Sequence, residues 1–288
     1  VFYPMEMYFT NFTFDNYQLV SYNRAINVYL TNSQNYGLIK MQNISVSNAN
    51  IVWYCRFFSI DLAAPIANTI LNYFPTIILD SITFDGVSIQ YSDLFYINYE
   101  IGQKTNIYCD ELFHIQISNA RLENITFYES EFVQSDGYLI AVSDLIASNI
   151  ILNVSSRLFV SSNILSTFFL TNSQLKNITL SDHSGIAISN VTTARDLKLE
   201  ACYTNNNVSI FAETRPFIIY NTTFSNISAD SKSIFFSSTN PMVIIQNNTF
   251  SQATLNHSNL FEVGGYLYFL DTKSYFIEWW NNGRAYYP

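Results

Sequence analysis

Apolar and polar residues alternate with a period of two along much of the chain. The alternation is clear in residues 114–118 (His-Ile-Gln-Ile-Ser) and in residues 122–127 (Leu-Glu-Asn-Ile-Thr-Phe). Successive side chains of a strand point to opposite faces of a sheet, so this period predicts strands with one buried and one wet face. β-Branched and aromatic residues, which strands favour, are abundant, and no amphipathic helix longer than two turns is predicted.

A doublet of apolar residues recurs along the chain, usually after Ser, Asp, Gly or Asn. Its copies are Leu94-Phe95, Leu112-Phe113, Leu139-Ile140, Leu158-Phe159, Ile186-Ala187, Ile210-Phe211, Ile234-Phe235 and Leu260-Phe261, and Leu38-Ile39 resembles an earlier copy. Successive copies are 18 to 28 residues apart. Short strands at this spacing predict a solenoid in which each coil stacks on the next.

A Thr-Phe pair runs in phase with the doublet. It occurs at Thr83-Phe84, Thr126-Phe127, Thr223-Phe224 and Thr249-Phe250, and the last two copies align at an offset of 26 residues. We therefore expect Phe224 beside Phe250, and Ile210, Ile234 and Leu260 beside one another, in inward-facing ladders.

These repeats predict an all-β fold, a single-stranded parallel β-helix with coils of about 18–28 residues, forming one domain over residues 1–288. A β-sandwich gives no reason for the same doublet to recur, and a propeller blade needs a longer repeat. Residues 221–227 (Asn-Thr-Thr-Phe-Ser-Asn-Ile) and 233–238 (Ser-Ile-Phe-Phe-Ser-Ser) resemble coils of right-handed parallel β-helix proteins of the pectin-lyase-like superfamily. The resemblance covers about residues 80–270 and is one of repeat style, so it implies a fold more than a chemistry.

Few residues are charged: Lys, Arg, Asp and Glu make up 12% of the chain, which has a net charge of −9. The basic residues are scattered, which argues against nucleic acid as a partner. No apolar stretch is long enough to span a membrane, and no signal peptide is evident, so we expect a processed form or an excised segment. Solubility must come from neutral polar groups, or from something attached to them.

Eleven Asn-x-Ser/Thr sequons make N-glycans the candidate attachment. Their asparagines are Asn11, Asn43, Asn124, Asn153, Asn177, Asn190, Asn207, Asn221, Asn226, Asn247 and Asn256. In eight of them the middle residue is Phe, Ile or Val, so on a strand Asn and the hydroxyl would face water while the apolar residue enters the core. An alternating strand rich in Asn and Thr would show the same pattern.

The three cysteines, Cys55, Cys109 and Cys202, have no metal-binding spacing. They are either three buried free thiols, or a Cys55–Cys109 disulfide with Cys202 left over.

No catalytic motif is evident. The Asn-Thr-Asp, Asp-Asp, Gly-His-Gly and Arg-Ile-Lys motifs of polygalacturonase-like β-helices are absent. His183 beside Asp182 is interpreted as a solvated turn, and Asp110-Glu111 as a corner facing water. The sequence therefore predicts no enzyme activity, cofactor or metal site.

Both ends of the chain are dense in aromatic residues. The end segments 1–9 and 275–288 are expected either to cap the solenoid or to join one copy to the next through Phe2, Tyr3, Tyr8, Trp279, Trp280, Tyr286 and Tyr287. The leading hypothesis is an extracellular or cell-surface structural glycoprotein that forms a coat, filament or appendage as a head-to-tail homopolymer. An adhesin or carbohydrate-binding module would instead show an aromatic or polar stripe free of glycans, and a polysaccharide-degrading enzyme a cleft with clustered Asp, Arg or Lys.

Overall fold

The structure, a computed structural model, describes most of the chain in eleven segments. They are residues 5–30, 36–63, 76–100, 114–135, 139–161, 166–189, 191–213, 217–238, 242–263, 266–280 and 284–287. Within them the chain forms parallel strands that stack as a β-solenoid, as the sequence predicts. The described residues contain no helix long and apolar enough to cross a membrane.

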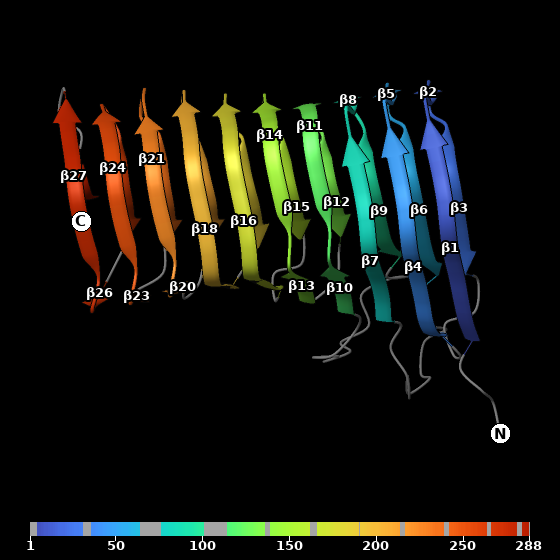
Figure 1. Cartoon of the computed structure of the whole chain (residues 1–288). Coiled ribbons are helices and arrows are strands. Elements are labelled where there is room, and N and C mark those ends of the chain that lie inside the picture. Colours follow the sequence, from blue (N-terminus) through green and yellow to red (C-terminus); the bar gives the residue numbers. More distant parts are fainter. Residues whose placement is uncertain are drawn as a thin grey trace.

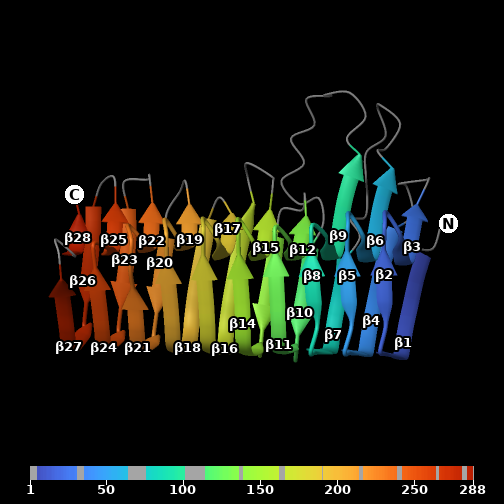
Figure 2. The ribbon, with the colours of Figure 1, turned by 90° about the horizontal axis from the view of Figure 1, so that it is seen from above.

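The strands form two sheets that lie as two layers (Figures 1 and 2). The larger, 18-stranded sheet contains β1 (Met5–Asp15), β2 (Gln18–Val20), β4 (Tyr36–Ser47), β5 (Asn50–Val52), β7 (Thr76–Asp85), β8 (Ser88–Gln90), β10 (His114–Ser118), β11 (Arg121–Tyr128), β13 (Leu139–Ser143), β14 (Ile146–Asn153), β16 (Thr167–Ser181), β18 (Val191–Asn205), β20 (Phe217–Tyr220), β21 (Thr223–Ala229), β23 (Met242–Gln246), β24 (Thr249–Asn256), β26 (Tyr266–Leu270) and β27 (Lys273–Trp280). The 10-stranded sheet contains β3 (Arg24–Leu30), β6 (Arg56–Ala63), β9 (Asp93–Glu100), β12 (Glu131–Ser135), β15 (Arg157–Ser161), β17 (Gly185–Ser189), β19 (Ser209–Glu213), β22 (Ile234–Ser238), β25 (Asn259–Val263) and β28 (Arg284–Tyr287).

Coil length differs between the two halves of the molecule. From β10 onward, partner residues on neighbouring strands are 24 to 28 positions apart, as in the pairs Thr167↔Val191 and Leu139↔Thr167. In the N-terminal half the spacing rises to 38 between Leu38, Thr76 and His114, which exceeds the predicted range. Residues 64–75 and 101–113 lie within these longer coils and outside the described residues, as does the predicted Leu112-Phe113 doublet.

Two columns of left-handed backbone bend each coil of the larger sheet. The first comprises Asn11, Asn43, Ser81, Asn119, Asp144, Asn172, Asp196, Asn221, Asn247 and Asp271, and the second Asn16, Asn48, Gly86, Asn124, Asn149, Asn177, Ala201, Asn226 and Gln252; all have φ between 47° and 65°. Gly, Asn and Asp visit this region most readily, which explains why they dominate both columns. Side-chain amides also bond along the columns: Asn43 Nδ2 donates to Asn11 Oδ1 at 3.0 Å, and Asn247 Nδ2 to Asn221 Oδ1 at 3.1 Å.

The core lies between the two sheets and consists of stacked apolar columns. Phe224 pairs with Phe250, and their rings stack at 4.6 Å, which confirms the predicted ladder. Phe84, by contrast, pairs with Leu122, whereas Phe127 pairs with Ile89 and Leu152. Phe127 therefore belongs to a different column, on the far side of the bend at Asn124.

The register corrects the predicted alignment of the doublets. Ile234 pairs with Ser209 and Asn259, one position away from the column of Ile210 and Leu260. Ile234 follows the last positive-φ residue of its corner, Lys232, by two positions, whereas Ile210 follows Asn207 and Leu260 follows His257 by three.

A difference of one position along a strand places a side chain on the other face, so Ile234 does not share the face of Ile210 and Leu260. The prediction for the Leu139-Ile140 doublet is also wrong, because this doublet lies in β13 of the larger sheet. The position expected for it in the smaller sheet, between Phe95 and Phe159, is occupied by Val133.

Candidate functional site

The corner through which the chain passes from the larger to the smaller sheet is the first unusual surface. We name Tyr22, Trp53, Tyr54, Tyr91 and Tyr128 the aromatic corner, because they follow or end β2, β5, β8 and β11 at this point. The rings of Tyr22 and Tyr54 stack at 5.3 Å, and those of Trp53 and Tyr91 at 5.2 Å. Tyr91 meets Tyr128 edge-on at 5.4 Å. Neighbouring coils thus place two sets of contacting aromatic rings along this edge, Tyr22 with Tyr54 and Trp53 with Tyr91 and Tyr128.

The backbone at the aromatic corner is poorly suited to aromatic residues. Tyr22, Trp53, Tyr54 and Tyr91 have φ between 51° and 66°, a region that costs an L-residue with a Cβ about 1–2 kcal/mol. Later coils place His183, Asn206, Asn207 and Lys232 at the same corner, also with positive φ.

Burial does not compensate for this cost, because Tyr22, Trp53 and Tyr54 are 75%, 55% and 61% exposed. Backbone strain without burial points to a function rather than to stability.

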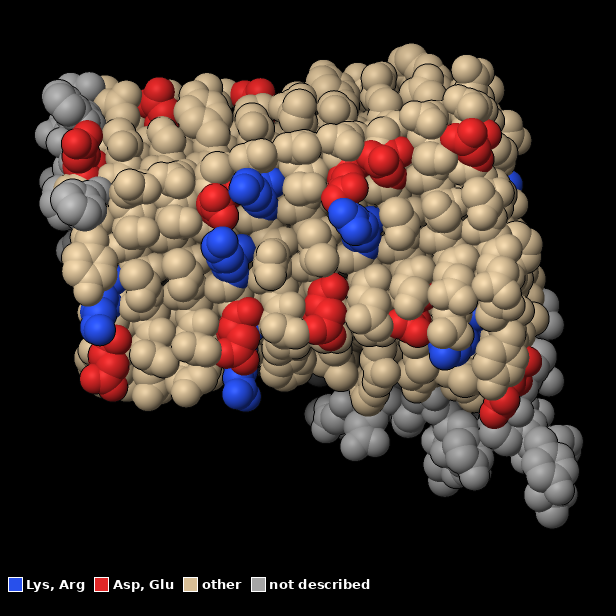
Figure 3. Space-filling view, viewed as in Figure 1, with Lys and Arg blue, Asp and Glu red and all other residues tan. Residues whose placement is uncertain are grey.

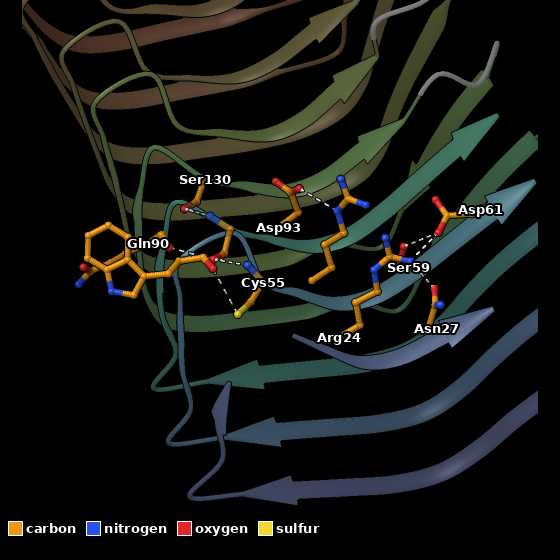
Figure 4. Close-up of polar contacts among 11 residues, drawn as sticks. Arg24, Asn27, Cys55, Ser59, Asp61, Gln90, Asp93 and Ser130 are labelled. Atoms are coloured by element: carbon orange, nitrogen blue, oxygen red, sulfur yellow. Dashed lines mark hydrogen bonds and ion pairs between the residues drawn. The ribbon is translucent and has the colours of Figure 1, made fainter. Parts of the chain in front are cut away.

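A ladder of buried hydroxyls supports the aromatic corner from below. The backbone N–H of Cys55 donates to Ser92 Oγ at 3.1 Å, that of Ser92 to Ser130 Oγ at 3.1 Å, and that of Ser130 to Ser156 Oγ at 3.2 Å. Each of these hydroxyls donates in turn to a carbonyl of its own corner, as Ser92 Oγ does to Gln90 O at 2.8 Å. Figure 4 shows Cys55, Gln90 and Ser130 gathered at this corner. The hydrogen bonds fix the backbone on which the rings are carried.

A column of charged residues lies two or three positions after the tyrosines of the aromatic corner along the chain. We name Arg24, Arg56, Asp93, Glu131 and Arg157 the charged column, since they are register partners on β3, β6, β9, β12 and β15. Arg24 Nη1 lies 2.6 Å from Asp61 Oδ2 and donates to Asn27 Oδ1 at 2.8 Å (Figure 4). Arg56 Nε lies 3.9 Å from Asp93 Oδ2. Two carboxyl groups therefore lie next to each other between arginines.

Burial governs the chemistry of the two carboxyl groups. Loss of solvent raises the pKa of Glu131 to about 9, and its hydrogen bond to Asp93 adds to the rise. Burial also raises the pKa of Asp93, although the hydrogen bonds that it accepts from the Glu131 side chain and backbone oppose the rise. The arrangement is one in which Glu131 keeps its proton and donates it to Asp93.

Ten of the eleven sequon asparagines lie among the described residues, and Asn190 lies outside them. Eight are exposed, namely Asn11, Asn43, Asn124, Asn177, Asn207, Asn221, Asn226 and Asn247, and these are also the eight with positive φ. They occupy bends and corners rather than regular strand positions. Asn153 and Asn256 are half-buried, and each takes part in a hydrogen bond, Asn153 from Ser181 Oγ and Asn256 to Asp230 Oδ1.

Most of the predicted subunit contacts cannot be placed. Phe2 and Tyr3 lie outside the described residues, as do the side chains of Trp279, Trp280, Tyr286 and Tyr287, although the backbone of these last four continues both sheets. Tyr8 is exposed on β1, where its hydroxyl donates to Glu6 Oε2 at 2.7 Å.

The other candidate residues are more ordinary. His183 is exposed in a turn, as predicted. Cys55 and Cys202 are buried free thiols, and burial raises the pKa of Cys202 to about 12, which makes it unreactive. Cys109, Asp110 and Glu111 lie outside the described residues. Among the residues described, no three metal-ligating side chains come together.

Sequence reasoning missed both the aromatic corner and the charged column. The sequence contained a signal, because an aromatic residue precedes a charged one by two positions in Tyr22-Asn23-Arg24, Tyr54-Cys55-Arg56 and Tyr91-Ser92-Asp93. The long coils of this half place these copies 32 and 37 residues apart, outside the predicted spacing of 18 to 28.

Comparison with known proteins finds similarity at the level of fold. No family model matches the sequence, and no curated protein matches it. The mannuronan C-5 epimerase AlgE4 A-module of Azotobacter vinelandii is 9% identical, with 99% of this chain and 91% of that one covered and a TM-score of 0.24. The Streptococcus pneumoniae surface adhesin PfbA is 8% identical, covering 98% and 91%, with a TM-score of 0.21. The chain is a parallel β-helix. Scores this low carry no argument beyond the fold.

One prediction is corrected by the comparison. The GH136 lacto-N-biosidase of Eubacterium ramulus is 9% identical, with 98% of this chain and 61% of that one covered and a TM-score of 0.26. Like the epimerase, it is an enzyme of similar fold. The prediction that the chain is not an enzyme does not stand, because enzymes share this fold and the lack of familiar catalytic motifs does not exclude catalysis on this scaffold.

Proposed function

We propose that the chain is a surface-displayed binding module of the adhesin type, in which the β-helix presents the aromatic corner to a ligand. The observation that carries the proposal is that large aromatic residues occupy strained, exposed backbone positions where later coils have mostly polar residues. Tyr and Trp combine apolar area with a polar tip and dominate many binding interfaces. The corner also meets the expectation for an adhesin, since none of its residues belongs to a sequon.

The ligand that best fits this face is a linear, neutral polysaccharide lying along the solenoid axis. The rings recur at the spacing of the coils, which suits a polymer with a short repeat. The Tyr hydroxyls and the Trp N–H supply hydrogen bonds, and the corner itself presents no basic side chain that would select an acidic polymer. Figure 3 shows that charged groups are few and of mixed sign on the face that it presents.

The sequons support display outside the cell. Eight sequon asparagines are exposed at bends, where an attached glycan would extend into solvent. Glycans there would also explain how a surface with so few charges stays soluble. We therefore propose an extracellular, N-glycosylated protein.

Substitution of Trp53 and Tyr54 tests the binding proposal. The expected result for W53A/Y54A is at least a tenfold loss of affinity for immobilised neutral polysaccharides, because exposed aromatic anchors of this kind contribute on the order of 1–2 kcal/mol each. Y203A is the matched control, since Tyr203 is exposed on the larger sheet away from the corner. Equal binding by both variants, or binding only to protein ligands, would contradict the proposal.

A further inference from the structure

The carboxyl pair of the charged column is used by nothing described so far. Asp93 and Glu131 are register partners on β9 and β12, so their side chains emerge one coil apart, about 4.8 Å, on the same face of the sheet. The Glu131 backbone N–H and side-chain carboxyl both bond to the Asp93 carboxyl. The Asp93 side chain is only 15% exposed, so water cannot readily separate two negative charges here.

The flanking arginines are poorly placed to neutralise both carboxylates. Arg56 approaches Asp93 no closer than 3.9 Å, and its guanidinium lies 3.2 Å from the centre of the Tyr96 ring. Arg157 donates through Nη1 to the backbone carbonyl of Ser156, and its Nε is buried without a partner. None of the ion pairs within 4 Å among the described residues joins Arg157 to Glu131.

The next coil explains why Arg157 leans away from Glu131. Its register partner there is Gly185, and a Cβ at that position would come within 3.4 Å of Arg157 Cδ and Nε. The same Cβ would lie 2.4 Å from the Ser209 carbonyl oxygen, so only glycine fits. Arg157 therefore packs toward Gly185 and leaves Glu131 facing Asp93.

We propose that Asp93 and Glu131 share one proton at neutral pH, and that this proton fastens the coil of β10–β12 to the coil of β7–β9. Loss of the proton leaves two adjacent negative charges with incomplete compensation, which loosens the junction. The groups that face the pair are Arg56 from β6, which lies over the Tyr96 ring of β9, and Arg157 from β15. Glu129 at the preceding corner is exposed. The inference does not depend on the proposed binding function.

The direction of the pH effect follows from proton linkage. An unfolded Glu ionises near its ordinary value, whereas burial raises the pKa of Glu131 to about 9 in the folded protein. The folded state thus holds more protons between these values, and stability falls as pH rises through this window. The contribution is fully present below about pH 4 and is lost progressively up to about pH 9.

Hydrogen exchange followed by mass spectrometry measures this junction directly. Between pH 6 and 9, after correction for intrinsic exchange, protection of β9 and β12 should fall by up to about tenfold per pH unit, the limit for one proton. Protection of β22 and β25 in the same molecule should stay constant. In E131Q, which keeps a donor to Asp93 but cannot ionise, the fall should disappear. The matched control E129Q alters an exposed Glu and should keep it.

Two outcomes would overturn the proposal: pH-independent protection in the wild-type protein, or an unchanged slope in E131Q. The double variant D93N/E131Q controls for a general loss of folding. Its two side-chain amides can form a hydrogen bond with each other, as those of Asn221 and Asn247 do. A second readout is the carboxyl-carbon NMR signal of Glu131, assigned by its absence from E131Q. It should titrate above pH 7, whereas a midpoint near 4 would exclude the shared proton.

Discussion

The exposed sequon asparagines of this protein have a role in backbone conformation that is independent of any glycan. Each exposed sequon asparagine occupies a position of positive φ, which Asn adopts more easily than most residues. Strand alternation predicts that these asparagines are exposed, whereas in the structure they are exposed because they occupy bends. The sequence could locate these residues and could not distinguish the two causes, because a bend without Gly or Pro leaves no separate mark. Occupancy by sugar remains a prediction.

Glycan occupancy should differ between two groups of sequons. The eight exposed asparagines should be modified in part or in full, whereas Asn153 and Asn256 should stay largely unmodified. Asn256 is half-buried and donates to Asp230 at 2.8 Å, and the hydroxyl of its sequon, on Ser258, is buried. Peptide mass spectrometry before and after amidase treatment measures each site. Full occupancy of Asn256, or at most one occupied site in all, would contradict this prediction.

At the scale of elements, the bends act as joints between neighbouring strands. Asn149 links three coils, because its amide donates to Asn124 Oδ1 and it accepts from Asn177 Nδ2, each at 3.0 Å. N149A should lower the free energy of unfolding by about 2 kcal/mol, through left-handed strain and the two lost bonds. N149G should cost about half as much, since it removes only the bonds.

Urea denaturation measures both losses, with S148A as a control at the adjacent strand position. Equal losses in N149A and N149G would mean that backbone conformation contributes nothing at this bend.

The repeating elements were largely predictable, and their register was not. Period-two alternation identified the strands, and the match between Phe224 and Phe250 placed two coils correctly. The error at Ile234 arose because the number of residues between the corner and the doublet differs by one between coils, and the sequence does not mark where a corner ends. Pairing of Asp93 with Glu131 could not be foreseen either, since they are 38 residues apart in coils whose length the repeat did not reveal.

At the scale of the whole molecule, head-to-tail association remains a prediction. Tyr8 on β1 and Tyr275 on β27 are both exposed, at 57% and 49%, on the first and last described coils. If copies join end to end, Y8R or Y275R should shorten or abolish filaments seen by electron microscopy, because a charge would enter an aromatic contact. Deletion of residues 275–288 would be a poorer test, since it removes β28 and most of β27.

Y266R offers a control in the assembly experiment, because Tyr266 is exposed on the last coil but in a different strand. An intact protein that stays monomeric at high concentration would contradict end-to-end assembly.

Within the part of the chain that the structure describes, the bends of one coil form hydrogen bonds with the coils on either side. A gene encoding such a chain can therefore gain or lose one coil by an in-frame duplication or deletion without disturbing the remainder. Residues 221–225 and 247–251, Asn-Thr-Thr-Phe-Ser and Asn-Asn-Thr-Phe-Ser, have the form of such a copy. In descendants of this gene, length should vary in steps of one coil.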